Sequence, residues 1–517
     1  MPEGHLLARL LLALGLVGVI GRSWAVPLAV RQMQQRTIWA ERQLLAGASA
    51  VRTEHMAIGR AARGMVRQQT RSLATPFYFD QVVDHSAGNL TTFKQRVFIN
   101  ANYYSPGGPV YLLNSGETPA SPSYLVAGEP FTLAKATGGM VLIIEHRYYG
   151  ESYPVADMSG PNMRYLTVDN ALEDIAHFIR NAAPFVKSAI GVDISPGSKW
   201  VAVGGSYSAT LAAWARQKYP ALIHAAYSSS APVLARADFF QYDEVVAQAL
   251  PCAPHIAEAI QVLDRILDSG NRTLINSWKR AFGLQALKDD ADFAGALTDQ
   301  MSYTVQYYMP PAPGSGAPDA IATLCGWFNN SKNIPLQNMA DMTAAHIRAS
   351  NIDPASAYSS GAGATNTSLH QDGRAWYYQT CTQFGFWQAA PPMPRQRLRS
   401  KYVTAAWQSK PCGLFFGSEI DGQPDTEALN RQFGGFAPNV TRVVFVNGLR
   451  DPWSQLSVSV NETTSKEIAQ SDHNVVITMP LASHVTDFYF ASTRTDFGVD
   501  IARQSILAAI KRFLAED

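Results

Sequence analysis

A serine stands between an apolar segment and a helical segment, at Ser206. Residues 200–203 form an apolar run that predicts a buried strand, and residues 208–218 have the pattern of a helix. Between them lie Gly204 and Gly205, whose small size lets a strand and a helix meet closely. This arrangement is typical of the nucleophile elbow, although Ser208 occupies the last glycine position of the usual G-x-S-x-G pattern. We therefore predict that Ser206 is a catalytic nucleophile.

A serine hydroxyl is a weak nucleophile, so it needs a histidine base and an acid that orients the base. Asp451 follows the apolar run at residues 442–446, and His484 follows the run at 475–479. Both positions come after predicted strands, where ligand crevices form in parallel sheets. The chain order serine, aspartate, histidine predicts a triad of Ser206, Asp451 and His484.

Two backbone N–H groups are candidates for binding the oxyanion that serine attack creates. One is the N–H of Tyr207, which directly follows the serine. The other comes from the loop after the apolar run at residues 110–113, where Gly116 is the first candidate and Glu117 the second.

The predicted strands and helices that position these residues alternate along the chain. Strands are expected at 110–113, 140–144, 200–203, 225–228, 442–446 and 475–479, and helices at 167–182, 208–218 and 501–513. This rhythm predicts a mostly parallel sheet, and with the elbow it indicates an α/β-hydrolase core. Glu145 and Arg147, after the second of these strands, are interpreted as a structural ion pair rather than as substrate-binding charges.

The strand rhythm stops near residue 235 and returns near residue 435. We therefore predict that residues 76–235 and 435–517 form the two parts of the hydrolase core. Residues 236–434, with helical patterns and Pro/Gly-rich breaks, are predicted to be a helical cap insertion.

The N-terminal region has the features of an exported chain. Residues 10–20 are apolar but too short to span a bilayer, and a small-residue cleavage site ends at Ala25, so residues 1–25 are predicted to be a signal peptide. A signal anchor is the alternative. Residues 26–75 carry arginines at 31, 36, 42, 52, 60, 63, 67 and 71 and are interpreted as a pro-segment or a basic extension without function.

Composition narrows the class of function. Lysine and arginine total 42 against 41 acidic residues, so no electrostatic argument supports binding to nucleic acid or to an anionic membrane. We expect no metal, no cofactor and no membrane span after signal cleavage. None of the four cysteines forms a C-x-x-C pair, and in an exported chain disulfides are favoured. Glycosylation is expected among six sequons, at Asn89, Asn271, Asn329, Asn366, Asn439 and Asn461.

Several strings resemble one family of serine peptidases. They are EHRYYGES from Glu145, GGSYSA from Gly204, YSSSAPV from Tyr227, RAWYYQTCTQFGFWQ from Arg374, NGLRDPW from Asn447 and SHVTDF from Ser483. Together, over about residues 76 to 515, they resemble the lysosomal Pro-Xaa carboxypeptidase family, which includes dipeptidyl peptidase II and thymus-specific serine protease. Ala209 departs from the family pattern, because glycine usually occupies that position.

The resemblance implies cleavage of peptide substrates after proline or a small residue. It also implies that Trp453 helps to form the acyl pocket, with Glu117 as a further substrate-binding candidate, and that disulfides join Cys252 to Cys325 and Cys381 to Cys412. The expected location is the secretory pathway, with secreted, lysosomal and vacuolar destinations all open.

Three questions stay open on sequence alone. The protein is alternatively a carboxylesterase or lipase on the same fold, or a catalytically silent hydrolase-fold binding protein. Carboxypeptidase, dipeptidyl peptidase and prolyl endopeptidase modes are not distinguished. The oligomeric state is also undecided, with a homodimer as one alternative.

Overall fold

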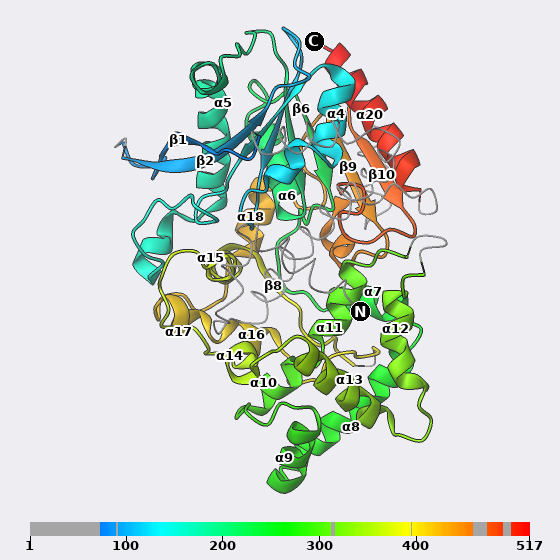
Figure 1. The fold of residues 1–517 in the computed structure, drawn as a ribbon. Helices are drawn as coiled ribbons and strands as arrows, with labels where there is room; N and C mark the ends of the chain where they lie inside the picture. The colour runs from blue at the N-terminus through cyan, green and yellow to red at the C-terminus, as the bar shows by residue number, and fades with distance from the viewer. Residues whose placement is uncertain (1–72, 89–90, 312–315, 394, 459–472, 490–497) are drawn as a thin grey trace, which may run out of the picture.

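An eight-stranded sheet forms the upper part of the molecule in Figure 1, as far as the described residues show. The computed structural model describes residues 73–88, 91–311, 316–393, 395–458, 473–489 and 498–517. In spatial order the strands are β1 (Phe77–Val82), β2 (Thr92–Asn100), β4 (Met140–Ile144), β3 (Val110–Asn114), β5 (Trp200–Gly205), β6 (Ala225–Ser229), β9 (Val443–Gly448) and β10 (Val475–Met479). From β4 to β10 every neighbouring pair is parallel, whereas β1 and β2 add antiparallel pairs at one edge.

The central strands are apolar on both faces because helices cover both faces. In β3, Leu112 packs into one core cluster, whereas its neighbours Tyr111 and Leu113 pack into the other. The first cluster includes α5 (Val168–Ile190) and α6 (Tyr207–Lys218), and the second includes α4 (Glu129–Thr137) and α20 (Val499–Ala515). Figure 1 shows α5 and α20 on opposite sides of the sheet. This architecture confirms the predicted α/β-hydrolase core.

Helix α5 begins where the sequence predicted and ends later. The side chain of Thr167 accepts a hydrogen bond from the N–H of Asn170, which caps the helix N-terminus. The helix then continues past residue 182, through Pro184, to Ile190. A proline removes one backbone donor, but the buried Val186 still anchors the last turns against the sheet.

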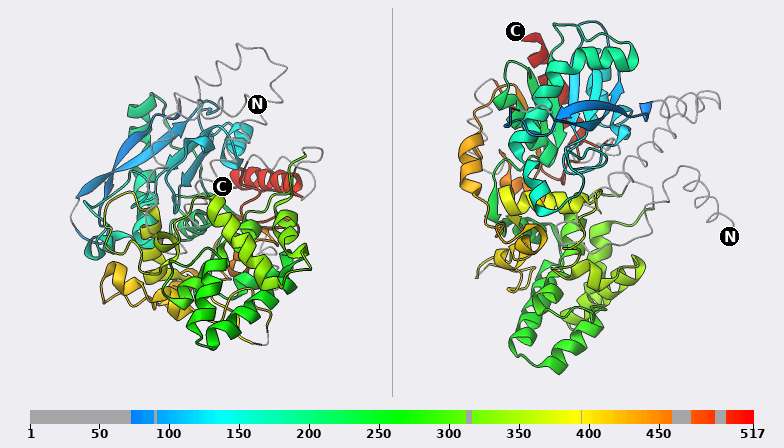
Figure 2. Two further views of the ribbon diagram at one scale, coloured as in Figure 1. Left: turned by 60° about the horizontal axis from the view of Figure 1, so that its bottom comes forward. Right: turned by 90° about the vertical axis from the view of Figure 1, so that its left-hand side faces the viewer.

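We call residues 236–434 the cap segment. Its helices are α7 (Gln241–Ala249), α8 (Ala253–Asp268), α9 (Arg272–Ala281), α10 (Asp290–Gly295), α11 (Asp299–Gln306), α12 (Ala320–Gly326), α13 (Pro335–Ala349), α14 (Pro354–Tyr358), α15 (Asp372–Gln379), α16 (Ala405–Ser409), α17 (Cys412–Phe416) and α18 (Thr426–Phe433). Most of the cap segment lies below the sheet in Figure 1, whereas α18 lies beside α6, with the rings of Phe433 and Trp214 stacked 4.1 Å apart. In the right-hand view of Figure 2 the helices of the cap segment again lie mainly beyond one end of the sheet. A short parallel pair, β7 (Arg236–Asp238) and β8 (Gly385–Trp387), was not predicted.

Short helical turns complete the fold. They are η2 (Pro122–Leu125), η3 (Gly160–Tyr165), η4 (Trp327–Asn329), the π-helical turn η5 (Thr380–Phe384) and η6 (Pro452–Leu456). Two of them matter for the site, because η5 continues α15 toward the core and η6 directly follows Asp451.

Two disulfide bonds lie inside the cap segment. Cys252, at the start of α8, is bonded to Cys325 in α12, and Cys381, in η5, is bonded to Cys412 in α17. This is the pairing that the family resemblance implied. Disulfides persist in oxidising compartments, so the bonds fit a protein of the secretory pathway.

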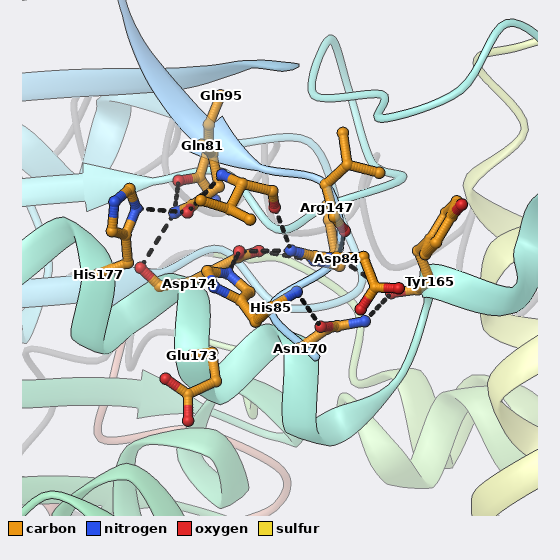
Figure 3. Close-up of polar contacts among 12 residues, drawn as sticks. Gln81, Asp84, His85, Gln95, Arg147, Tyr165, Asn170, Glu173, Asp174 and His177 are labelled. Carbon is orange, nitrogen blue, oxygen red and sulfur yellow. Dashed lines mark hydrogen bonds and ion pairs between the residues drawn. The ribbon is translucent and has the colours of Figure 1, made fainter. Parts of the chain in front are cut away.

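The predicted ion pair between Glu145 and Arg147 is wrong, because each side chain has another partner. Arg147 is fully buried and pairs with Asp174 of α5, with Nε donating to Oδ2 at 2.7 Å (Figure 3). Its remaining N–H groups donate to Asp174 Oδ1 and to the carbonyl groups of residues 82, 83 and 165. All five guanidinium donors are therefore used within the fold, which leaves none for a substrate. Glu145 instead pairs with Arg96.

Some predictions concern residues outside the described ranges. The signal peptide, the basic extension up to residue 72, Asn89 and Asn461 lie there. Of the other sequon asparagines, Asn271, Asn329 and Asn439 are exposed and Asn366 is half-buried. Among the described residues, no helix combines the length and apolarity needed to cross a bilayer.

Candidate active site

Ser206 occupies a strained turn between β5 and α6. Its φ of 62° and ψ of −133° lie in a region that serine rarely adopts, as expected of a nucleophile elbow. A Cβ at Gly204 would lie 2.3 Å from the backbone carbonyl of Ser208, so strand and helix meet where only glycine fits. Ala209 is fully buried in the core, and its N–H donates to the Ser206 carbonyl at 2.9 Å. The methyl group at this position is therefore accommodated by the elbow.

His484 and Asp451 are buried and hydrogen bonded to each other. His484 Nδ1 lies 2.7 Å from Asp451 Oδ2, and the other carboxylate oxygen accepts the N–H of Trp453 at 2.9 Å. Because a carboxylate accepts, Nδ1 carries the proton and Nε2 of a neutral imidazole has a free lone pair. Nε2 has no hydrogen-bond partner among the described residues.

The loops that carry Asp451 and His484 are joined by backbone hydrogen bonds. The N–H of Leu449 donates to the carbonyl of Met479, and the N–H of Arg450 donates to that of Ala482, each at 3.0 Å. A Cβ at Gly448 would lie 2.3 Å from the Ala482 carbonyl oxygen, so glycine permits this approach. Two residues that are 33 positions apart in the chain, Asp451 and His484, are thus held together.

The cap segment also holds the histidine loop. The N–H of His484 donates to the carbonyl of Gln306 at 3.0 Å, and Ser483 Oγ donates to the same carbonyl at 2.7 Å. Tyr307, the next residue, places its ring 6.0 Å from the His484 ring. The position of the histidine therefore depends on a residue from the cap segment as well as on the core.

A cavity of about 170 Å³ opens beside Ser206 and His484. Its lining includes apolar residues from core strands and from the segment that follows His484, among them Leu113, Ile143, Val485 and Phe488. Polar groups in its wall include Ser115, Glu117, Ser208 and Tyr307. The cavity therefore brings the predicted nucleophile and base to one mostly apolar space, the usual form of a small-molecule or peptide subsite.

The predicted oxyanion donors lie around the elbow. Tyr207 is the first residue of α6, so its N–H has no intrahelical acceptor and lies at the positive end of the helix dipole. The N–H of Gly116 donates to Asn114 Oδ1 at 3.0 Å, so that group is already engaged. Glu117, the second candidate in this loop, lines the cavity.

A buried hydrogen-bond chain holds the side chain of Tyr207. His146 Nδ1 donates to the carbonyl of Arg147 at 2.7 Å, which leaves Nε2 to accept the Tyr207 hydroxyl at 3.1 Å. Burial lowers the pKa of His146 to about 4, so the imidazole stays neutral as this arrangement requires. Gln379 donates to the same hydroxyl at 2.9 Å and accepts from Tyr149 at 2.6 Å. The chain links the elbow to α15 of the cap segment.

Two other acidic or aromatic candidates lie away from the cavity. Asp487, three residues after His484 and therefore an alternative partner for it, is fully buried and accepts the hydroxyls of Tyr227 and Ser229 at 2.6 and 2.7 Å. Trp453 is buried beside His484, with ring centres 6.5 Å apart, but it is not among the residues that line the cavity.

Sequence reasoning missed the contribution of Gln306 and Tyr307. They lie at the end of α11 in a segment whose sequence has no catalytic motif, and their contacts with Ser483 and His484 bridge 177 positions in the chain. Ser483, the first residue of the SHVTDF string, was noted in the sequence only as part of the family resemblance, and not for its contact with Gln306.

The parallel sheet and the strained serine turn define the protein as an α/β-hydrolase with the framework of a serine hydrolase. Comparison with known families narrows this class, because residues 81–506 match the model of the serine carboxypeptidase S28 family. The chain belongs to this family and is a serine peptidase.

Known relatives resemble the chain over most of its length. It is 31% identical to the thymus-specific serine protease of Mus musculus, over 85% of this chain and 87% of that protein. It is 30% identical to the thymus-specific serine protease of Homo sapiens, over 84% and 86%. It is 28% identical to a probable extracellular serine carboxypeptidase of Arthroderma benhamiae, over 76% of this chain and 60% of that protein.

Proposed function

We propose that the protein hydrolyses peptide bonds on the carboxyl side of proline or a small residue, with Ser206, His484 and Asp451 as its triad. The observation that carries this proposal is the buried His484–Asp451 hydrogen bond of 2.7 Å, with His484 and the strained Ser206 in the wall of one cavity. An acid-oriented imidazole beside an elbow serine is the arrangement that acyl transfer needs.

The proposed reaction starts when Ser206 Oγ attacks the carbonyl carbon of the scissile bond. His484 Nε2 accepts the serine proton, and Asp451 stabilises the imidazolium that forms. The N–H of Tyr207 and an N–H of the 114–117 loop donate to the oxyanion. Because the N–H of Gly116 is bound to Asn114, we assign the second donor to Glu117.

The amine leaves after His484 returns the proton to its nitrogen, and the acyl group stays on Ser206. A water molecule then attacks the ester, with His484 again as the base, and the acid product is released. The apolar wall of Leu113, Ile143 and Phe488 suits a proline ring or an alanine methyl group. Family membership supports the same choice of substrate.

A labelling and turnover experiment tests this proposal. A fluorophosphonate probe should label the wild-type protein at Ser206, and a prolyl peptide amide should be cut faster than a nitrophenyl ester of similar size. Labelling together with ester turnover alone would instead support the carboxylesterase alternative, and absence of labelling would support a silent binding protein.

The Trp453→Ala variant tests whether Trp453 forms a wall of the acyl pocket or instead supports the position of His484. Trp453 packs against Phe239, Tyr242 and Phe386 and lies beside His484, so we expect Trp453→Ala to disturb the imidazole. Turnover of prolyl and alanyl substrates should fall equally, by up to roughly 10²-fold. The free energy of unfolding should fall by about 3–5 kcal/mol.

Steady-state kinetics on the two substrates and denaturant unfolding measure these effects. Trp327→Ala, at a half-exposed position of the cap segment, is the matched control and should change neither. A distinctly larger loss for the prolyl substrate would show that Trp453 reaches the acyl pocket.

Glu129 is expected to make the protein more stable in mild acid than at neutral pH. Burial raises its pKa to about 7, against an ordinary value of 4.5, with Asp487 adding to the rise and Arg503 opposing it. The folded state therefore binds a proton more tightly than the unfolded chain between pH 4.5 and 7. Stability from this group is fully present below pH 4.5 and is lost as the pH rises through 7.

The expected result is a free energy of unfolding that is higher at pH 5 than at pH 7.5. Glu129 contributes up to about 3 kcal/mol to this difference, since one pKa unit corresponds to about 1.4 kcal/mol. Denaturant unfolding of Glu129→Gln should show a smaller difference, whereas the exposed control Glu258→Gln should keep it. An unchanged pH dependence in Glu129→Gln would contradict this assignment.

A further inference from the structure

The segment that follows His484 forms part of the cavity wall. Phe488 and Tyr489 both line the cavity beside the elbow serine. A Cβ at Gly205, the residue before this serine, would lie 3.5 Å from the Phe488 ring, and the ring of Tyr124 lies 5.4 Å from the same ring. The position of Phe488 and Tyr489 therefore sets how much space an acyl group finds next to the nucleophile.

Three successive carbonyl groups of this segment are held by residues of the core. Arg503 of α20 donates from Nε to the carbonyl of Asp487 at 3.0 Å and from Nη2 to the carbonyl of Tyr489. Between these two, the carbonyl of Phe488 accepts the N–H of Glu129, the first residue of α4, at 3.1 Å. The first N–H groups of a helix have no intrahelical acceptor, so this one is available for the contact. The backbone around Phe488 is thus fixed by two helices whose described residues do not line the cavity.

Arg503 and Glu129 also pair with each other. Arg503 Nε lies 3.4 Å from Glu129 Oε2, and the two side chains are 15% and 2% exposed. A guanidinium group is a planar fork of donors, so it can hold two carbonyl groups at once, whereas a lysine offers a single nitrogen. The type of residue at position 503 therefore matters for the geometry of the wall as well as for the charge of Glu129.

We propose that Arg503, with Glu129, is a positioning residue that fixes the wall at residues 488–489 and so determines which acyl groups the cavity binds. This inference rests on the proposed function and adds a determinant of specificity to the same site. The effect falls on binding rather than on the triad, because His484 is held separately by Asp451 and by the cap segment. Loss of Arg503 should therefore weaken the binding of a large acyl group more than it slows the chemical step.

Steady-state kinetics of Arg503→Met tests the proposal, because methionine keeps much of the apolar stem and removes every donor. KM for a prolyl peptide amide should rise roughly tenfold, as the loss of one or two hydrogen bonds predicts. KM for the matched alanyl amide should rise less than roughly threefold, because a methyl group makes little contact with the two rings. For both substrates kcat should stay within roughly threefold, the pattern of lost ground-state binding. Arg503→Lys should fall between the wild type and Arg503→Met.

Arg512→Met is the matched control. Arg512 lies on the same helix, is about half exposed and pairs with Glu516 at 4.0 Å, so its loss should change neither constant. An unchanged ratio of prolyl to alanyl KM in folded Arg503→Met would overturn the proposal. An equal fall in kcat for both substrates would also overturn it, because that result would place the effect on the triad.

Thermal unfolding shows whether each variant is folded. If Arg503→Met does not fold because Glu129 has lost its cation, the double variant Arg503→Met/Glu129→Met removes the buried acid as well, and the same KM ratios are expected of it. The backbone N–H of residue 129 persists in this variant. Failure of all three variants to fold, Arg503→Lys included, would show that Arg503 acts on stability and would overturn its assignment to specificity.

The two proposals fail differently. A wild-type protein that cleaves nitrophenyl esters but no peptide amide would overturn the proposed function, while a comparison of prolyl and alanyl esters would still test Arg503. A wild-type protein that cuts prolyl amides, together with an unchanged KM ratio in Arg503→Met, would leave the proposed function standing and overturn only the role of Arg503.

Discussion

Replacement of Ser206 by alanine is expected to lower kcat/KM for prolyl substrates by at least roughly 10⁴-fold, because the triad acts as a unit and nothing else attacks the carbonyl. The fold should persist. Alanine keeps the Cβ, and the N–H of residue 206 still donates to the carbonyl of Ser229. Steady-state kinetics measures the loss of activity, and thermal unfolding measures the persistence of the fold. Fluorophosphonate labelling should be lost in the same variant.

Ser208→Ala is the matched control for this variant. Its hydroxyl donates to the carbonyl of Asn114 and cannot attack a substrate while it does so. We expect a loss of less than about tenfold, since one hydrogen bond contributes about 1 kcal/mol. Residual labelling of Ser206→Ala, or an equal loss in Ser208→Ala, would argue against Ser206 as the nucleophile.

Asp451→Asn is expected to lower kcat by roughly 10⁴-fold, as the same change does in a serine protease triad. The reason is the tautomer of His484. Asp451 Oδ1 accepts the N–H of Trp453, so the amide oxygen of asparagine would stay there and its NH₂ group would face Nδ1 of His484. Nδ1 would then have to accept, and the proton would move to Nε2, which could no longer take the serine proton.

The Asp487→Asn variant tests whether Asp487, rather than Asp451, orients His484. The carboxylate of Asp487 accepts hydroxyls of Tyr227 and Ser229, and burial raises its pKa, so the change should act on stability more than on catalysis. Kinetics of both variants at one pH, together with thermal unfolding, distinguish the two acids. Near-full activity in Asp451→Asn with loss in Asp487→Asn would reverse the assignment.

Two buried carboxyl groups, Glu129 and Asp174, are expected to affect stability in different pH ranges. Glu129 has its pKa raised by burial and favours folding in mild acid. Asp174 has its pKa lowered by its partners Arg147 and His85, so its contribution is lost only as the pH falls through the range below 3.8. We therefore expect a broad stability maximum in the mildly acidic range, which the unfolding measurements on Glu129→Gln also test.

The amino-acid sequence determined the features that depend on neighbours along the chain. The turn at Gly204–Ser206 needs only small residues next to one another, and the runs at 110–113 and 200–203 need only continuous apolar character. These local patterns predicted the mostly parallel sheet and the α/β-hydrolase class. The same patterns missed β1 and β2, in which buried and exposed residues alternate at 78–81 and 92–95, so that neither strand is a continuous apolar run. Family resemblance supplied the disulfide pairing, which spacing alone could not.

Only the tertiary structure decided which distant groups meet. Arg147 pairs with Asp174 rather than Glu145, and Trp453 lies beside His484 but outside the cavity wall. The loop of His484 is held by Gln306, from a segment with no motif of its own. Hydrogen bonds and ion pairs depend on distances of a few ångströms between segments that folding brings together. A linear pattern does not encode such distances. The partners of Arg147 and of the His484 loop could therefore be identified only from the folded structure.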